Sequence, residues 1–157
     1  MEKLIFDDGI LRLDVNGNGL LCFNPSDFNL YQRFCEFSRR LPEYEREYKR
    51  EYEAALLDNK EETAFEATER ELNRAKEIDA KIKKELSVVF GEQNDFDKLL
   101  GGVNLMSFGK NGERVVTNLL DALSPYIEKG VKSYLKSEAG NAVANAKKER
   151  AKRSGRA

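Results

Sequence analysis

The segment Asp14–Gly19 has the residue types of a calcium-binding loop. Its sequence, Asp-Val-Asn-Gly-Asn-Gly, matches the D-x-N-x-N-G opening of an EF-hand, whose oxygen ligands coordinate Ca²⁺. An EF-hand also needs a bidentate carboxylate at the twelfth position of the loop. That position is Pro25 here, the ninth is Cys22, and the flanking residues resemble strands rather than helices. The segment therefore predicts a hairpin turn and no metal site.

Two glycine-containing segments have the composition of phosphate-binding loops. Gly17-Asn18-Gly19 lacks the third glycine of a dinucleotide fingerprint, and Gly109-Lys110-Asn111-Gly112 lacks the residue order of a P-loop. We interpret both segments as turns. No cofactor-binding residue is predicted.

Catalytic chemistry has few candidates in this chain. It contains no His, which removes the commonest general base and every nucleophile–His couple. Carboxylates are abundant between Glu43 and Glu85, with 14 acidic against 10 basic residues, but this mixture is typical of a solvated helix face. Cys22 and Cys35 are interpreted as buried or bystander thiols of a reducing compartment. No catalytic residue is predicted, and we expect a protein that is not an enzyme.

Three tyrosines are the strongest candidates for binding. Tyr44, Tyr48 and Tyr52 repeat at i, i+4 and i+8, which places them on one face of a helix. Such a stripe is either internal core or a contact surface, because tyrosine combines a large apolar body with a polar tip. Both interpretations stay open. If the stripe is a contact surface, Phe65 is a fourth candidate for binding a partner.

Residues 1–25 have the pattern of a small β-hairpin or meander. Lys3–Phe6, Ile10–Val15 and Leu20–Phe23 are candidate strands, separated by Asp7-Asp8-Gly9 and Asn16–Gly19 as turns. So few strands are marginally stable alone. We therefore expect them to pack on a following helix, through Leu11, Leu13, Phe28, Tyr31 and Phe34.

Residues 26–90 favour long helices. Ser26 is a candidate N-cap, and Pro42 predicts a kink or a new helix start. From Glu43 to Phe90 the chain contains no Gly or Pro. A weak point at residues 58–60 predicts an αα-hairpin turn, with one unbroken helix as the alternative.

Residues 91–138 predict a C-terminal helical segment, and residues 139–157 a basic tail. Gly91 is expected to end the long helix, a short helix follows near Asn94–Leu100, and Ser124-Pro125 is expected to interrupt the next helix. Apolar content falls after Gly140, so the tail is expected to be flexible and disordered. The predicted fold class is mainly α, with an N-terminal β-hairpin or meander packed on a bundle of long helices.

Charge and hydropathy exclude two classes of partner. The net charge of −1 argues against binding nucleic acid, which requires a basic contact surface. No apolar run approaches the roughly 20 residues of a membrane span. The N-terminus has no basic segment followed by an apolar one, so no signal peptide is predicted. We expect a soluble cytoplasmic protein with a protein partner, and self-association stays open.

The order of these segments resembles the tail assembly chaperones of siphophages and Gram-positive prophages. The resemblance rests on the aromatic helix entered through Asn24-Pro25-Ser26-Asp27-Phe28, on Leu86–Glu92 with its Phe-Gly pair, and on Asp97–Leu105 with Asp-Lys-Leu-Leu-Gly-Gly. It covers most of the chain, although none of these motifs is a catalytic signature.

The resemblance implies a non-enzymatic helper in the bacterial host cytoplasm. Its implied partners are the tape measure protein, which it would keep soluble, and tail tube subunits, which it would recruit. The alternative is a small helical inhibitor of a host defence protein, encoded by a phage or mobile element. Gene order separates the two, because a tail tube gene and a long tape measure gene would flank the chaperone.

Overall fold

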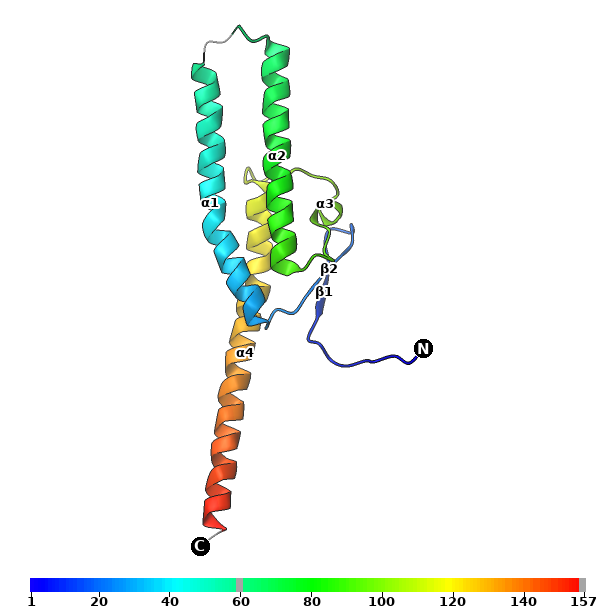
Figure 1. The fold of residues 1–157 in the computed structure, drawn as a ribbon, viewed down its shortest axis with the longest axis vertical. Helices are drawn as coiled ribbons and strands as arrows, with labels where there is room; N and C mark the ends of the chain where they lie inside the picture. The colour runs from blue at the N-terminus through cyan, green and yellow to red at the C-terminus, as the bar shows by residue number, and fades with distance from the viewer. Residues whose placement is uncertain (59–60, 156–157) are drawn as a thin grey trace.

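The computed structural model describes residues 1–58 and 61–155 of the chain. Figure 1 shows two long helices side by side, a small strand pair beside them, and a last helix that extends beyond the body of the molecule. The predicted fold class, a mainly helical chain with an N-terminal β-hairpin on long helices, is confirmed. The elements in chain order are β1 (Leu11–Asp14), β2 (Leu20–Phe23), α1 (Phe28–Leu57), α2 (Ala64–Phe90), α3 (Phe96–Leu99) and α4 (Val115–Ser154).

Strands β1 and β2 form an antiparallel hairpin, in which Leu13 lies opposite Leu21. The loop between them is stabilised by Asp14, whose Oδ1 accepts a hydrogen bond of 2.8 Å from the Gly17 amide. Asn16 and Gly17 have φ values of 52° and 77°, a region that Asn and Gly tolerate best. The predicted hairpin turn is therefore confirmed.

The expected strand at Lys3–Phe6 is wrong. Residues 1–10 form no strand, and the side chains of Leu4, Ile5 and Phe6 are 88%, 85% and 71% exposed. Strand propensity is realised only when the backbone groups find a paired strand. This segment runs away from the hairpin instead (Figure 1).

Helices α1 and α2 form an αα-hairpin, so the alternative of one unbroken helix is wrong. Helix α1 ends at Leu57, and Thr63 caps α2 by accepting a hydrogen bond of 3.1 Å from the Glu66 amide. The Tyr44 hydroxyl on α1 donates to Glu85 Oε1 on α2 at 2.7 Å. Of the turn predicted at residues 58–60, positions 59 and 60 lie outside the described residues.

Pro42, expected to kink a helix or start one, and Pro125, expected to interrupt one, both lie inside continuous helices. Pro42 is within α1 and Pro125 is within α4, so the predicted helix break at Ser124-Pro125 is wrong. Figure 1 shows a bend in the lower part of α1, which is the usual accommodation of an internal proline. In α4 the Ser124 hydroxyl donates to the Leu120 carbonyl at 2.7 Å.

The core is organised around Phe90 at the end of α2. Its ring centroid lies 5.1 Å from that of Phe23, 6.2 Å from Phe34 and 5.7 Å from Phe96, so one side chain joins β2, α1 and α3. Leu11, Leu13 and Tyr31 pack against this core as expected, whereas Phe28 is 42% exposed. The buried apolar residues are Leu21, Phe23, Leu30, Phe34, Phe37, Leu41, Ile82, Leu86, Val89, Phe90, Phe96, Leu99, Leu105, Met106, Val116, Leu123 and Ile127.

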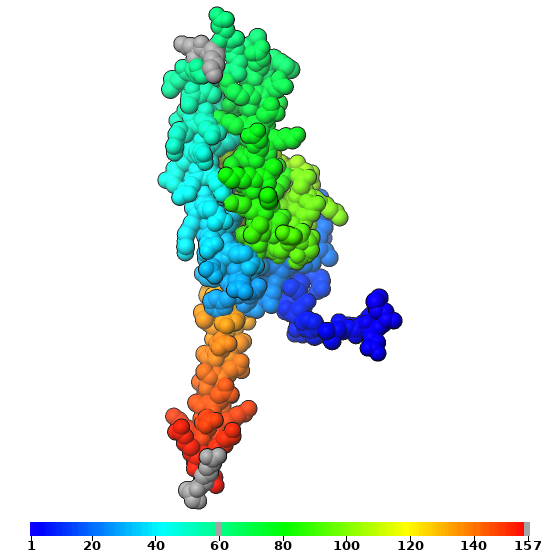
Figure 2. Space-filling model, in the orientation of Figure 1, coloured from blue at the N-terminus to red at the C-terminus, as the bar shows by residue number. Residues whose placement is uncertain are grey.

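The expectation of disorder in the tail, residues 139–157, is not met over residues 139–154, because α4 continues as an exposed helix through Ser154; positions 156 and 157 of that prediction lie outside the described residues. Ala, Lys and Arg are strong helix formers, and the segment extends a helix whose first part is already packed. Figure 2 shows it projecting from the body of the molecule. Within the described ranges, no helix combines the length and apolar character needed to cross a membrane.

Candidate functional site

Tyr44 lies inside the α1–α2 hairpin rather than on a free surface. Its hydroxyl donates to Glu85 Oε1 at 2.7 Å, and the Lys81 ammonium lies 4.5 Å from its ring centroid. This hydrogen bond, together with partial burial, raises the pKa of Tyr44 above its ordinary value of 10.0. Tyr44 is therefore part of the hairpin interface, as the core interpretation of the stripe predicts.

Tyr48 occupies the boundary between the hairpin interior and solvent. The Arg74 guanidinium lies 4.4 Å from its ring centroid, and Arg74 Nη2 donates to the Tyr48 carbonyl at 2.7 Å. Arg114, from the N-cap of α4, lies 5.8 Å from the same ring centroid. Both cations lie close enough to the half-buried Tyr48 ring to be attracted by its π-electrons.

Tyr52 faces an open apolar groove. A groove with a volume of about 530 Å³ lies beside Tyr48 and Tyr52 and is also lined by Phe108. A second hollow of about 490 Å³ continues it past Tyr52 to Leu56. We call the two together the hairpin groove, which is lined chiefly by Tyr48, Tyr52, Leu56, Leu72, Ala75 and Phe108.

The apolar side chains of the hairpin groove are largely exposed. Tyr52 is 44% exposed, Leu56 65%, Leu72 66% and Phe108 65%. Single exposed apolar residues are ordinary, but a contiguous set in a groove marks an interaction site. Binding in the groove would therefore bury apolar side chains that are now exposed.

The four predicted binding residues do not form one surface. Tyr48 and Tyr52 line the groove, whereas Tyr44 is half-buried, bonded to Glu85 and outside the groove lining, and Phe65 is 77% exposed near the start of α2, also outside it. Sequence reasoning missed Leu56, although it continues the i+4 spacing of the tyrosines. It also missed Leu72 and Phe108, which reach the groove only through the pairing of α1 with α2 and the path of the loop before α4.

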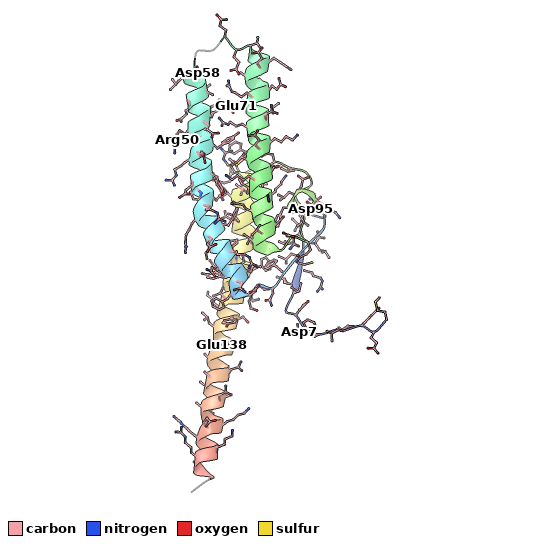
Figure 3. All side chains as sticks on the ribbon, in the orientation of Figure 1. Asp7, Arg50, Asp58, Glu71, Asp95 and Glu138 are labelled. Atoms are coloured by element: carbon pink, nitrogen blue, oxygen red, sulfur yellow. The ribbon has the colours of Figure 1, made fainter. Side chains whose placement is uncertain are left out.

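Charged residues surround the groove. Arg74 lies 3.6 Å from Glu71 and 3.8 Å from Glu51, and Arg70 pairs with Glu62. Figure 3 shows Glu71 on the side of α2 that faces α1, and Arg50 on the outer side of α1. Residues 51–73 carry eight acidic and two basic side chains, a net charge of −6. The end of the hairpin is therefore acidic over residues 51–73, whereas the groove lining itself carries Arg70 and Arg114 as well as Glu71.

Acidic and thiol side chains are the remaining groups that could bind a metal or act as nucleophiles. Over residues 1–58 and 61–155, no group of three or more His, Cys, Asp or Glu side chains has an arrangement that could hold a metal ion. Cys22 and Cys35 are free, half-buried thiols. The arrangement that stands out chemically is the apolar groove with its acidic surroundings.

Comparisons with known proteins give one partial match. No protein-family model matches the chain, and no solved structure matches it significantly. A sulfite reductase (NADPH) hemoprotein beta-component of Serratia proteamaculans (strain 568) is 32% identical over 119 residues, which are 76% of this chain and 20% of that protein. The chain thus spans about a fifth of the length of this curated relative.

Proposed function

We propose that this protein is a non-enzymatic binding protein whose hairpin groove takes a helical segment of a protein client. The observation that carries the proposal is the row formed by Tyr52, Leu56 and Leu72, each exposed by 44% or more along two neighbouring helices. A groove between two helices suits an amphipathic third helix, whose apolar face repeats every three to four residues.

The magnitudes favour apolar anchors over charges as the source of affinity. Exposed ion pairs contribute about 0–1 kcal/mol each and weaken with salt. A buried aromatic or aliphatic anchor at the centre of an interface contributes about 2 kcal/mol or more. Tyr52 and Leu72 combine large size with a position in the groove, so we assign them most of the binding free energy.

The resemblance to phage tail assembly chaperones is the basis on which we propose a client. We propose that the client is a tape measure protein, that the chain keeps it soluble in the bacterial cytoplasm, and that it helps recruit tail tube subunits. A long helical client suits a chaperone with an exposed groove and a highly charged surface, because the charges keep both proteins in solution. The long helices and the groove support this assignment.

The test is binding of purified tape measure protein to four forms of the chain. These are the intact chain, a groove variant with Tyr52→Ala and Leu72→Ala, a Val88→Ala control, and a truncation after Gly140. Val88 is a control on α2 because it is 59% exposed and outside the groove lining. Tyr44 is left intact, because its hydrogen bond to Glu85 belongs to the fold.

We expect the groove variant to bind at least tenfold more weakly, while the control binds as well as the intact chain and the truncation binds at least as well. Circular dichroism checks that each variant stays folded. Unchanged binding by the groove variant, with loss on truncation or in high salt, would contradict the groove and point to the basic end of α4. Capture of a host defence protein in place of the tape measure protein would support the inhibitor instead.

A further inference from the structure

The C-terminal part of α4 leaves the body of the molecule. The Tyr134 ring still packs on Phe28, with centroids 4.3 Å apart. Beyond it, Leu135 and Val143 are 54% and 55% exposed, and residues 136–154 are exposed throughout. We call residues 135–154 the tail helix. Figures 1 and 2 show it as a single rod, with no other described segment beside it.

A lone helix of this length gains little stability in water. Isolated helices are marginal because nucleation is costly, and most helices in proteins are stabilised by packing one face. The tail helix has such a face. Leu135, Ala139, Ala142, Val143 and Ala146 follow a spacing of three to four residues, which places them within an arc of roughly 100°.

The net charges of the surfaces indicate which one binds the apolar face of the tail helix. The tail helix carries six basic and two acidic residues, a net charge of +4, whereas residues 51–73 at the end of the hairpin, beside the groove, carry −6. Two tails would repel each other, as would two grooves. A tail and a groove attract each other, and both present exposed apolar side chains.

The two surfaces lie at opposite ends of the molecule. Figure 1 shows the tip of the α1–α2 hairpin at one end of the long axis and the C-terminus at the other. A chain therefore does not fold its own tail helix into its own groove. We propose that the tail helix of one copy docks in the hairpin groove of the next copy.

The dimensions of the two surfaces agree. Leu135 and Val143 are eight residues apart, which is about 12 Å along a helix, and Tyr48 and Leu56 at the two ends of the groove on α1 have the same separation. With the apolar pair seated in the groove and the tail directed toward the hairpin tip, residues 147–153 lie against the acidic tip. This segment carries five of the six basic residues of the tail helix.

Head-to-tail docking has a defined consequence for assembly. Each copy uses one surface as donor and a different one as acceptor, so the contact is heterologous and does not close by itself. Copies then add in chains as concentration rises. Because the inference rests on the groove of the proposed function, the client helix and the tail helix compete for one site.

The experiment measures self-association with no client present, so its outcome is independent of client binding. The groove variant again carries Tyr52→Ala and Leu72→Ala, and the tail variant carries Val143→Asp, Lys147→Glu and Lys148→Glu. Lys84→Glu with Lys98→Glu is the charge-matched control for the two lysines, because both are exposed and outside the tail. Sedimentation velocity gives the mass of each form, alone and in mixtures, at low and high salt.

We expect the intact chain and the control to grow beyond dimers with concentration, and self-association to weaken at least tenfold in high salt. Each variant alone stays monomeric. An equimolar mixture of the two variants forms one-to-one pairs and no larger species, because only one intact groove and one intact tail remain per pair. Self-association that survives in the groove variant but not in the tail variant would mean tail–tail pairing. Tail–tail pairing would overturn the proposal. So would an intact chain that stays monomeric, or two variants that do not pair when mixed.

Discussion

Gly130 on α4 lies directly against Pro25, the residue that joins the β-hairpin to α1. A Cβ built at Gly130 would be 2.0 Å from the Pro25 carbonyl oxygen and 2.4 Å from its carbonyl carbon. Both neighbours are backbone atoms, so no side-chain rotation relieves the clash. The close approach of α4 to the start of α1 therefore depends on glycine at this position.

Gly130→Ala is expected to separate α4 from this contact and to destabilise the fold. Overpacking costs about 1–3 kcal/mol and more where the backbone must move, so we expect a loss of about 3 kcal/mol in the free energy of unfolding. Gly140→Ala is the matched control, since a Cβ there meets no atom within 4 Å. That control is expected to keep the melting temperature and to increase helicity slightly. Equal melting temperatures for the two variants would contradict the assigned contact.

Asn94 ties the β-hairpin to the end of α2. Its Oδ1 accepts a hydrogen bond from the Cys22 amide at 2.9 Å, and its Nδ2 donates to the carbonyls of Cys22 at 2.9 Å and Phe90 at 3.0 Å. The residue is 3% exposed. One side chain thus pairs with both backbone groups of Cys22, as a neighbouring strand would.

Asn94→Ala leaves these backbone groups without their partner. A buried polar group that loses its hydrogen bond costs about 1–3 kcal/mol, so we expect unfolding by urea to show a loss of about 3 kcal/mol. Asn73→Ala removes an exposed asparagine of α2 and is expected to change stability by less than about 0.5 kcal/mol. A small effect at both positions would show that the hairpin is held by apolar packing alone.

Lys83 is buried between two carboxylates. Its Nζ lies 2.8 Å from Asp79 Oδ2 and 2.7 Å from Asp97 Oδ1, and the residue is 8% exposed. Burial lowers the pKa of Lys83, but the hydrogen bonds to Asp79 and Asp97 outweigh it and raise the pKa above the ordinary 10.5. Asp79 also accepts a hydrogen bond of 2.7 Å from the Leu105 amide, which connects this cluster to the loop before α4.

The raised pKa predicts a loss of stability in alkali. The folded state binds the Lys83 proton more tightly than the unfolded chain, so its contribution is complete below pH 10.5 and disappears as the pH rises through the folded-state pKa. Lys83→Met should therefore flatten the decline of unfolding free energy above pH 10.5. At neutral pH the same change should cost about 3 kcal/mol, because it leaves Asp79 without its cation.

Tyr44 titrates in the same direction, because its hydrogen bond to Glu85 raises its pKa. The comparison is therefore made in a Tyr44→Phe background, with and without Lys83→Met. Parallel pH profiles for the two forms would contradict the assignment to Lys83.

The local elements of this fold follow from sequence patterns. Leu11 and Leu13 alternate with polar residues, Asn16–Gly19 has turn chemistry, and Gly91 ends α2 as a C-cap with φ of 113°. Each of these depends on residues a few positions apart. The helix break predicted at Pro125 is wrong because the effect of a proline on a helix depends on packing by neighbouring elements. Helix α4 is held on both sides of Pro125, since Leu123 and Ile127 are in the core.

Only part of the groove lining could be predicted from the sequence. The stripe from Tyr44 to Tyr52 indicates one helical face, and its next position is Leu56. Nothing in the sequence indicates that Leu72 and Phe108 meet that face, because this depends on how α2 pairs with α1. The requirement for Gly130 is equally hidden, since it depends on Pro25, which is 105 positions earlier in the chain.

Arg74 holds the two helices of the groove in register, which connects stability to binding. It stacks on Tyr48, donates to the Tyr48 carbonyl, and lies within ion-pair distance of Glu51 and Glu71. Lysine would retain the charge but lose the planar guanidinium that stacks on the Tyr48 ring while donating to the Tyr48 carbonyl. We expect Arg74→Lys to cost about 1–2 kcal/mol, from the lost hydrogen bond and stacking.

The loss is expected to be local to the distal half of the hairpin. Amide hydrogen exchange should speed up in residues 48–57 and 64–75 and stay unchanged around Phe90, because the core lies beyond the altered contact. Client binding should also be weaker in the Arg74→Lys variant, because both helices form the groove. Arg50→Lys is the matched control on the outer side of α1 (Figure 3) and should change neither measurement. Faster exchange throughout the molecule would mean that Arg74 stabilises the fold as a whole rather than the groove.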